Sequence, residues 1–274
     1  MVVIKKRNQS KMPKKSTNSP SSSDSKIMES GWMYENLYKS MLADINSLQE
    51  LKALLATERK TRKEIDPIIA AIFNRIGDIY LDKSKYSQAE DSYKRVLSIL
   101  KKTTYIENEV IADVLNNLSL TYYLQGKKAK AEIMCKQGLE LLTKQLGKEY
   151  PAVGKYLNNL AELYRVQGKY KEEVVALKSA LRIFEKDPGE DRLDIFRTLD
   201  QLTNLYHSQG NYNEAEPLYR QLLQLEMKTC GKDKSGLEVI LKNMALLYKQ
   251  HGKRDQAKRL EQRAKRILSA KRKA

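Results

Sequence analysis

Cysteine and histidine are almost absent from the sequence, with two of each in 274 residues. Cys135 and Cys230 are too few and too far apart for the disulfide framework of a small secreted domain. His207 and His251 do not form the cluster of about four convergent ligands that a zinc site needs. A Gly-rich loop that could hold a phosphate is also lacking. We therefore expect no metal, no cofactor and no catalytic centre. The expected compartment is the reducing cytoplasm, with the nucleus as the alternative.

Chain breakers, strand formers and long hydrophobic runs are scarce as well. The sequence has 12 Gly, 6 Pro and 3 Phe, and most Val and Ile residues recur at helical spacing. No run approaches the roughly 18 consecutive apolar residues of a membrane span. At the start, the short apolar run Val2–Ile4 precedes its basic residues, which is the reverse of a signal peptide. With 41% hydrophobic and 31% charged residues, the composition predicts an all-α protein without a transmembrane segment.

Positive charge is concentrated at the two ends of the chain. Residues 1–28 carry seven basic and one acidic side chain, and residues 249–274 carry eleven basic and two acidic ones. These ends supply +15 of the net charge of +17. Residues 1–30, rich in Ser and Lys, are predicted to be a disordered basic tail, and residues 269–274 a basic C-terminal tail. Such ends could contact nucleic acid or anionic lipid, or serve as a nuclear import signal.

What the sequence does contain is a repeat of 42 residues. Five tyrosines mark its register: Tyr80, Tyr122, Tyr164, Tyr206 and Tyr248. Four residues after each tyrosine stand Ser84, Gly126, Gly168, Gly210 and Gly252. Nine residues after it stand Ala89, Ala131, Glu173, Ala215 and Ala257. Five copies in one register indicate a repeat architecture.

Each repeat is predicted to form two antiparallel helices. The first has one apolar face at three- and four-residue steps, as in Leu160, Ala161 and Tyr164, and ends at the glycine. Small residues such as Ala161 and Ala180 should allow close helix approach. Burial of Leu160 predicts a loss of about 2–5 kcal/mol for Leu160→Ala. Because Glu173 occupies a tight position that is Ala in the other repeats, we expect Glu173→Ala to be neutral or stabilising.

Residues 31–64 precede the repeats and contain an amphipathic pattern. Tyr34, Met41, Leu48 and Leu55 are seven residues apart. We interpret this pattern as a helix that caps the first repeat, and a coiled-coil seam between two chains is the alternative. Tyr38 lies 42 residues before Tyr80, which leaves open a sixth, degenerate repeat.

Two segments show a family resemblance: residues 150–170, YPAVGKYLNNLAELYRVQGKY, and residues 209–219, QGNYNEAEPLY. This Gly, Tyr, Ala and Leu spacing resembles the tetratricopeptide repeat, and the 42-residue period resembles the subtype of kinesin light chains. The resemblance covers about residues 65–268. It implies a right-handed α-solenoid of five helix pairs with an N-terminal capping helix. It also implies a non-catalytic scaffold or adaptor that binds a partner peptide or domain in a concave groove.

The first helix of each repeat should line that groove with polar side chains. The predicted binding residues are Asn116, Asn117, Asn158, Asn159, Arg165, Arg197, Gln201, Asn204, His207, Lys242 and Asn243. A carboxamide can both donate to and accept from a peptide backbone of any sequence. The family resemblance implies this role for Asn117, Asn159 and Asn243 in particular. The alternative is that these amides bond neighbouring helices or simply accompany the repeat.

Charged groove candidates differ between the two halves of the chain. In repeats one and two they are Arg75, Asp78, Asp82 and Asp113, a net of −2. In repeats three to five they are Lys155, Arg165, Arg197, Lys242, Lys249, Glu162 and Asp200, a net of +3. This division predicts a partner with an acidic segment over the later repeats, near Arg165 and Arg197, although a solvated surface without a selected partner explains the same charges. Nucleic-acid association through the basic ends is the alternative function.

Overall fold

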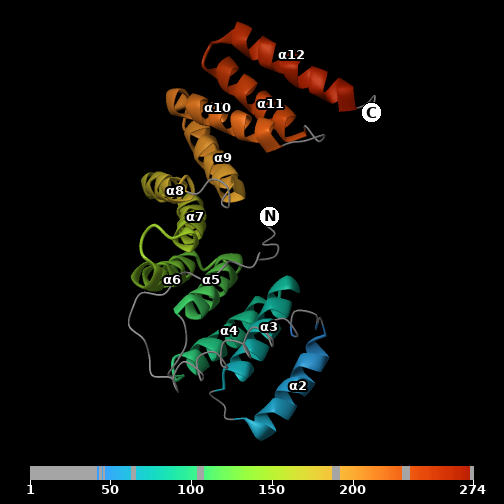
Figure 1. Ribbon diagram of the computed structural model, residues 1–274, viewed down its shortest axis with the longest axis vertical. Helices are drawn as coiled ribbons and strands as arrows, with labels where there is room; N and C mark the ends of the chain where they lie inside the picture. The colour runs from blue at the N-terminus through green and yellow to red at the C-terminus, as the bar shows by residue number, and fades with distance from the viewer. Residues whose placement is uncertain are drawn as a thin grey trace.

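The computed structural model describes residues 42, 45, 47–62, 66–103, 108–186, 192–229 and 235–271. Within these residues it contains eleven α-helices and no strand. The helices follow one another along a single curved stack, with α2 at one end and α12 at the other (Figure 1). The predicted N-terminal tail and the first part of the predicted capping region, residues 31–41, lie outside the described residues.

Five antiparallel helix pairs make up the stack. The first helices are α3 (Pro67–Asp82), α5 (Asn108–Leu124), α7 (Pro151–Val166), α9 (Arg192–Ser208) and α11 (Ser235–Gln250). The second helices are α4 (Tyr86–Leu100), α6 (Lys128–Leu146), α8 (Tyr170–Phe184), α10 (Tyr212–Thr229) and α12 (Arg254–Lys271). The predicted all-α solenoid of five pairs is thereby confirmed. In Figure 1, α5, α7 and α9 lie along the inner side of the curve, and α6 and α8 lie along the outer side.

The turn inside each pair has the predicted left-handed residue. Gly168 has φ 71°, and the amide of the next residue, Lys169, donates to the carbonyl of Tyr164 at 3.0 Å. This bond satisfies a carbonyl at the helix end that has no partner within the helix. Ser84 adopts the same conformation with φ 56°, although its Cβ makes that region less favourable than it is for glycine. The first repeat thus keeps the turn without the glycine.

The core runs along the stack between the two layers of helices. Leu160, Ala161 and Ala180 are buried, as the repeat predicts, and Cys135 on α6 is fully buried. At Gly154 a Cβ would lie 2.7 Å from Cζ of Phe184, so only glycine admits this ring between α7 and α8. Close approach of the helices therefore depends on small residues at particular positions.

Glu173 is the exception in this core. Its side chain occupies the position of Ala89 and Ala131 and is only 2% exposed, and its Oε2 has no hydrogen-bond partner. Burial raises the pKa of its carboxyl group to about 7, an effect that Arg165 opposes and Glu162 adds to. A buried carboxyl group without full hydrogen bonding is destabilising when charged.

Helix α2 (Leu48–Thr61) covers the first repeat. Leu51 is fully buried and belongs to a cluster that includes Ile72 and Ile76 of α3. Nε of Arg75 donates to the carbonyl of Ile45 at 3.2 Å, which also ties this region to α3. The apolar face of α2 thus packs within its own chain. This is the arrangement expected of a capping helix, and it leaves less apolar surface for a coiled coil.

No helix in the described ranges is long and apolar enough to cross a membrane.

Candidate functional site

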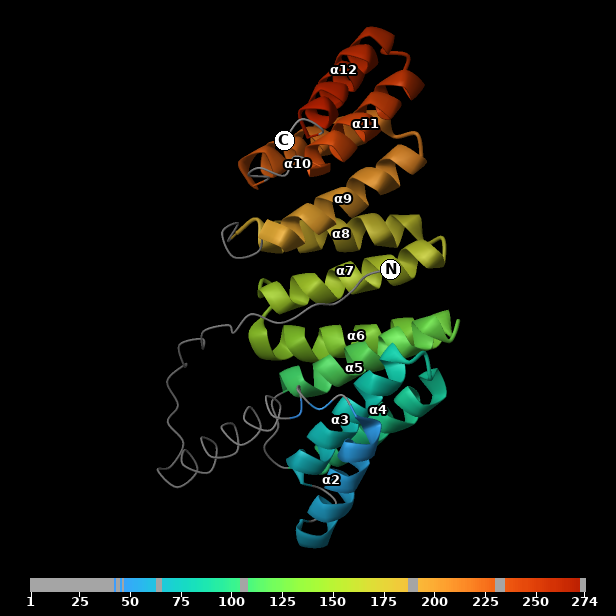
Figure 2. The same ribbon diagram turned by 90° about the vertical axis from the view of Figure 1, so that its right-hand side faces the viewer.

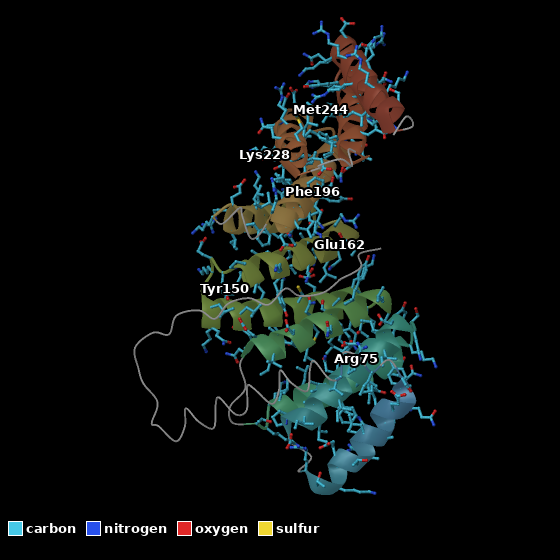
Figure 3. All side chains as sticks on the ribbon, turned by 45° about the vertical axis from the view of Figure 1, so that its right-hand side comes forward. Arg75, Tyr150, Glu162, Phe196, Lys228 and Met244 are labelled. Atoms are coloured by element: carbon cyan, nitrogen blue, oxygen red, sulfur yellow. The ribbon has the colours of Figure 1, made fainter. Side chains whose placement is uncertain are left out.

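The predicted binding residues lie on four successive first helices. Asn116 and Asn117 are on α5, Asn158, Asn159 and Arg165 on α7, Arg197, Gln201, Asn204 and His207 on α9, and Lys242 and Asn243 on α11. Arg75, Glu162 and Met244, labelled in Figure 3, mark α3, α7 and α11 along the stack. The helices run side by side and across the long axis of the molecule (Figure 2). The candidate residues are thus distributed over four first helices that follow one another along the stack.

Several of the amides hold neighbouring first helices together. Nδ2 of Asn159 donates to Oδ1 of Asn116 at 2.7 Å, which joins α7 to α5. Nδ2 of Asn158 donates to Oγ1 of Thr198 at 2.7 Å, which joins α7 to α9. The alternative role, bonding between helices, therefore applies to at least these amides. Their hydrogen bonds fix the spacing of α5, α7 and α9.

Other amide groups retain unused hydrogen-bonding capacity. Oδ1 of Asn158 and Oε1 of Gln201 are buried and have no hydrogen-bond partner in the described structure. Asn204 donates to Asp200 of its own helix at 3.1 Å, and its side chain is exposed. Asn117 and Asn243 are partly buried on α5 and α11.

His207 belongs to a cluster at the junction of repeats four and five. Its Nδ1 lies 3.0 Å from the hydroxyl of Tyr219, and its Nε2 lies 2.7 Å from Oε1 of Gln250 on α11. Tyr212 makes an edge contact with His207 and lies 5.4 Å from His251, measured between ring centroids. Because one of its partners belongs to the next repeat, His207 connects repeat four to repeat five.

Basic residues of the later repeats each lie beside a carboxylate. Arg165 pairs with Glu162, Arg197 lies 3.9 Å from Asp194, and Lys242 lies 2.6 Å from Glu238. Lys155 and Lys249 are likewise paired, with Asp194 and Glu261. Even so, these five basic side chains remain 52–59% exposed. Exposed ion pairs contribute about 0–1 kcal/mol each, so a ligand carboxylate can replace the internal partner at low cost.

Two charged candidates of the first repeat are turned toward the protein instead. Asp78 accepts a hydrogen bond of 2.8 Å from the hydroxyl of buried Tyr93. Burial raises its pKa to about 6, whereas this bond and Arg75 oppose the change. Arg75 is used to hold the backbone at Ile45. Because one cation and one anion are turned inward together, the net charge of −2 predicted for repeats one and two is unchanged and rests on Asp82 and Asp113.

A recurrent carboxylate ten residues after the marker tyrosine was not singled out from the sequence. Glu90 accepts from Tyr122 and Lys127 of the next repeat at 3.1 and 3.3 Å. Glu216 accepts from Tyr248 and Lys253 of the next repeat at 2.8 and 2.9 Å. Glu132 accepts in the same way from Gln167 and Lys169. The 42-residue spacing of these positions was the available signal.

These junction carboxylates are held ionised. For Glu216, the hydrogen bond from Lys253 is the largest effect, and together with Arg220 and Tyr248 it lowers the pKa to about 2 despite burial. Burial would raise the pKa of Glu90 and Glu132, but their hydrogen bonds lower both to about 2. At the junction of repeats three and four, Val174 and Asn211 replace both the carboxylate and the lysine.

An apolar pair on α11 was also missed. Val239 and Leu246 are 56% and 49% exposed, and they stand at the repeat positions that the groove candidates Lys155 and Glu162 occupy in repeat three. Lys242 lies between them in the sequence and Lys249 follows one turn after Leu246. Of the five repeats, only the last has large apolar residues at both of these repeat positions. Comparing these two columns across the repeats would have found the pair.

Other features do not coincide with the predicted site. A shallow hollow of about 360 Å³ lies between α7 and α8, lined partly by Leu157, Tyr164 and Val175, and it includes none of the predicted binding residues. Within the described residues, no group of three or more His, Cys, Asp or Glu side chains could hold a metal ion.

Comparison with known proteins identifies the repeat. The tetratricopeptide repeat model matches residues 68–144, 110–186, 157–226 and 194–270, which together span most of the chain. No match was found among curated protein sequences.

Solved structures show the same fold. BtubC (BKLC) from P. vanneervenii is 20% identical, with 87% of this chain and 92% of that chain covered and a TM-score of 0.69. Nearly identical TPR-like repeats of the kinesin light chain kind from Podosopora anserina are 20% identical, with 74% and 96% covered and a TM-score of 0.63. PilF of Pseudomonas aeruginosa is 17% identical, with 88% and 93% covered and a TM-score of 0.56. The chain therefore belongs to the tetratricopeptide repeat family, and its fold is similar to that of the kinesin light chain repeats from Podosopora anserina.

Proposed function

We propose that this protein is a non-catalytic scaffold that binds a segment of a partner protein along the inner side of its solenoid. Tetratricopeptide repeats generally serve as scaffolds for protein–protein contacts, and their stacking creates an extended concave surface. The observation that carries the proposal is the exposed apolar pair Val239 and Leu246 on α11, the first helix of repeat five, beside half-exposed lysines.

The chemistry of this surface favours a partner segment that is both acidic and apolar. Val239 and Leu246 are seven residues apart, so they present two apolar contacts about two helical turns apart on one face of α11. Lys242 and Lys249 flank them and are 59% and 52% exposed. An amphipathic segment could place its apolar side chains on the pair and its carboxylates on the lysines.

The remaining inner surface would orient this segment. Arg165 on α7 and Arg197 on α9 are 54% and 52% exposed and would add further cations, although each is paired with a carboxylate of its own helix. The amides that join α5, α7 and α9 hold these helices at fixed spacing. Helices that are already held in place lose less conformational entropy when a partner binds.

Affinity capture from native lysate, with and without nuclease, tests this function. The double variant Val239→Ser, Leu246→Ser is compared with the matched control Ile133→Ser, Val175→Ser, which removes two similarly exposed aliphatic side chains from the second helices α6 and α8. We expect protein partners that survive nuclease, persist with the control and are lost with the α11 variant. Partners that are insensitive to the α11 variant would contradict the proposed surface.

A direct measurement then tests the acidic character of the partner. The captured partner, produced separately, is titrated against the unaltered protein and against Lys242→Glu, Lys249→Glu. We expect this double change to weaken binding by about tenfold or more, because two favourable charge contacts become repulsive. Unchanged affinity would exclude an acidic segment at α11.

A further inference from the structure

The last helix has an unusually one-sided charge. Helix α12 contains seven basic and two acidic residues, a net charge of +5. The basic side chains that the structure describes on it are all exposed: Arg254, Lys258, Arg259, Arg263, Lys265 and Arg266. Helix α12 is the last described helix of the stack (Figures 1 and 2).

Some exposed cations on the other second helices are paired with a carboxylate, whereas on α12 Arg263 contacts the sulfur of Met227 at 3.6 Å. Lys94, Lys136 and Arg220 pair with Glu90, Glu132 and Glu216, respectively. On α12, by contrast, no ion pair joins any of the six cations to a carboxylate within the described part of the chain. Of the two acidic residues of α12, Glu261 is paired with Lys249 of α11. The positive charge of α12 is therefore available to a ligand.

Capping the solenoid does not by itself require this charge. A terminal helix needs a polar outer face, and mixed charges meet that need. Helix α2 covers the opposite end of the repeats with three basic and two acidic residues, a net charge of only +1. The excess on α12 thus needs an explanation other than solubility of the end of the stack.

The spacing and type of the cations point to phosphate groups. Arg259, Arg263 and Arg266 are at i, i+4 and i+7, so they share one side of α12 over about 10 Å of helix length. A single strand of nucleic acid is flexible, so its successive phosphates can each reach one of the three guanidinium groups. The planar guanidinium group can donate two parallel hydrogen bonds to one phosphate.

We propose that the outward face of α12 binds nucleic acid through its phosphate backbone, without sequence preference. No side chain described on α12 is a large exposed hydrophobic, so the helix has little to insert into the acyl region of a membrane. A phosphate backbone, by contrast, requires only cations, and log affinity then falls linearly with log salt concentration. This surface is separate from Val239 and Leu246 on α11.

Salt-dependent titration of the full-length protein tests the proposal. Binding of a labelled 20-nucleotide oligo(U) RNA is followed by fluorescence anisotropy between 50 and 200 mM salt. For Arg259→Gln, Arg263→Gln, Arg266→Gln we expect the slope of log K against log salt to decrease in magnitude by about 2, since each single-strand phosphate contact contributes about 0.7. At 0.1 M salt the affinity should fall by at least about tenfold.

A control with the same loss of net charge separates the site from a general electrostatic effect. Lys94→Gln, Lys136→Gln, Arg182→Gln removes one exposed cation each from α4, α6 and α8, and these cations are paired with Glu90, Glu132 and Glu149. We expect this control to bind RNA nearly as the unaltered protein does. Equal losses in both triple variants, or an unchanged slope in the α12 variant, would overturn the proposal.

Two further arms distinguish the remaining outcomes. Vesicles of phosphatidylserine and phosphatidylcholine replace the RNA, and binding to them without binding to RNA would assign the surface to membranes and overturn the proposal. The variant Val239→Ser, Leu246→Ser should bind RNA normally, so failure of the inner protein-binding surface can be recognised separately. If the two triple variants melt at the same temperature as the unaltered protein, a smaller slope of log K against log salt is not caused by unfolding.

Discussion

The buried carboxyl group of Glu173 should make the protein less stable as pH rises. Its pKa increases from 4.5 to about 7 in the folded chain, with burial as the largest cause. The folded protein therefore binds this proton more tightly than the unfolded chain does, and the free energy of unfolding decreases as pH rises from about 4.5 to about 7. The pKa difference corresponds to about 3 kcal/mol once pH exceeds the folded value.

Glu173→Gln provides the sharpest measurement, because glutamine keeps the shape of the side chain and removes its titration. Urea unfolding of the variant and of the unaltered protein is followed by circular dichroism at pH 5, 6, 7 and 8. We expect the stability difference in favour of the variant to be small at pH 5 and to approach about 3 kcal/mol at pH 8. Glu173→Ala should be neutral or stabilising, because alanine occupies this position in the other repeats.

The neighbouring Glu172 supplies the control for this experiment. It is exposed on the same helix, so Glu172→Gln should leave the pH dependence essentially unchanged. Long repeat arrays can unfold in parts, so the transitions are compared at two wavelengths before free energies are extracted. The stability of Glu173→Gln and that of the unaltered protein are compared from pH 5 to pH 8. If their difference does not change with pH, the assignment of a proton to this buried carboxyl group is refuted.

Three further predictions concern the junctions, the core and a turn. Glu216→Gln should lower the free energy of unfolding by about 1–3 kcal/mol at pH 7. Because the carboxylate contributes stability only while ionised, this loss should shrink as pH falls from about 4.5 toward about 2. Urea titrations at pH 7 and pH 3 measure the loss, and an equal loss at both pH values would contradict the prediction. In a Cys230→Ser background, a thiol reagent at pH 8 should label Cys135 only on unfolding, since burial raises its pKa to about 12; rapid labelling of the folded protein would argue against that burial. Ser84→Gly should stabilise the first repeat by about 0.5–1 kcal/mol because it relieves a left-handed residue with φ 56°, which a higher melting temperature would show.

Much of the fold could be predicted because the residues that specify a helix pair recur in each repeat. The apolar column at Leu160, the tyrosine at Tyr164 and the turn at Gly168 recur every 42 residues, and all depend on local helix geometry. The buried positions of Leu160, Ala161 and Ala180 followed from the same register.

The candidate site was less predictable, because its side chains interact across repeats. The columns containing Asn158 and Asn159 were visible in the sequence, but their bonds to Thr198 and Asn116 depend on how far one first helix is displaced from the next. That displacement arises from packing over the whole interface, which the repeat period does not contain.

By itself, the sequence determined the number of repeats, the positions of their turns and the residues that face the core, because these follow from periodicity and local conformational preference. Only the tertiary structure decided which polar groups would be used internally and which would remain available. Asp78 is turned to the buried Tyr93, whereas Val239 and Leu246 remain exposed on α11. The physical reason is that a side chain becomes a binding group only if no neighbouring helix satisfies or covers it, and those neighbours are brought together by the superhelical stacking of the repeats.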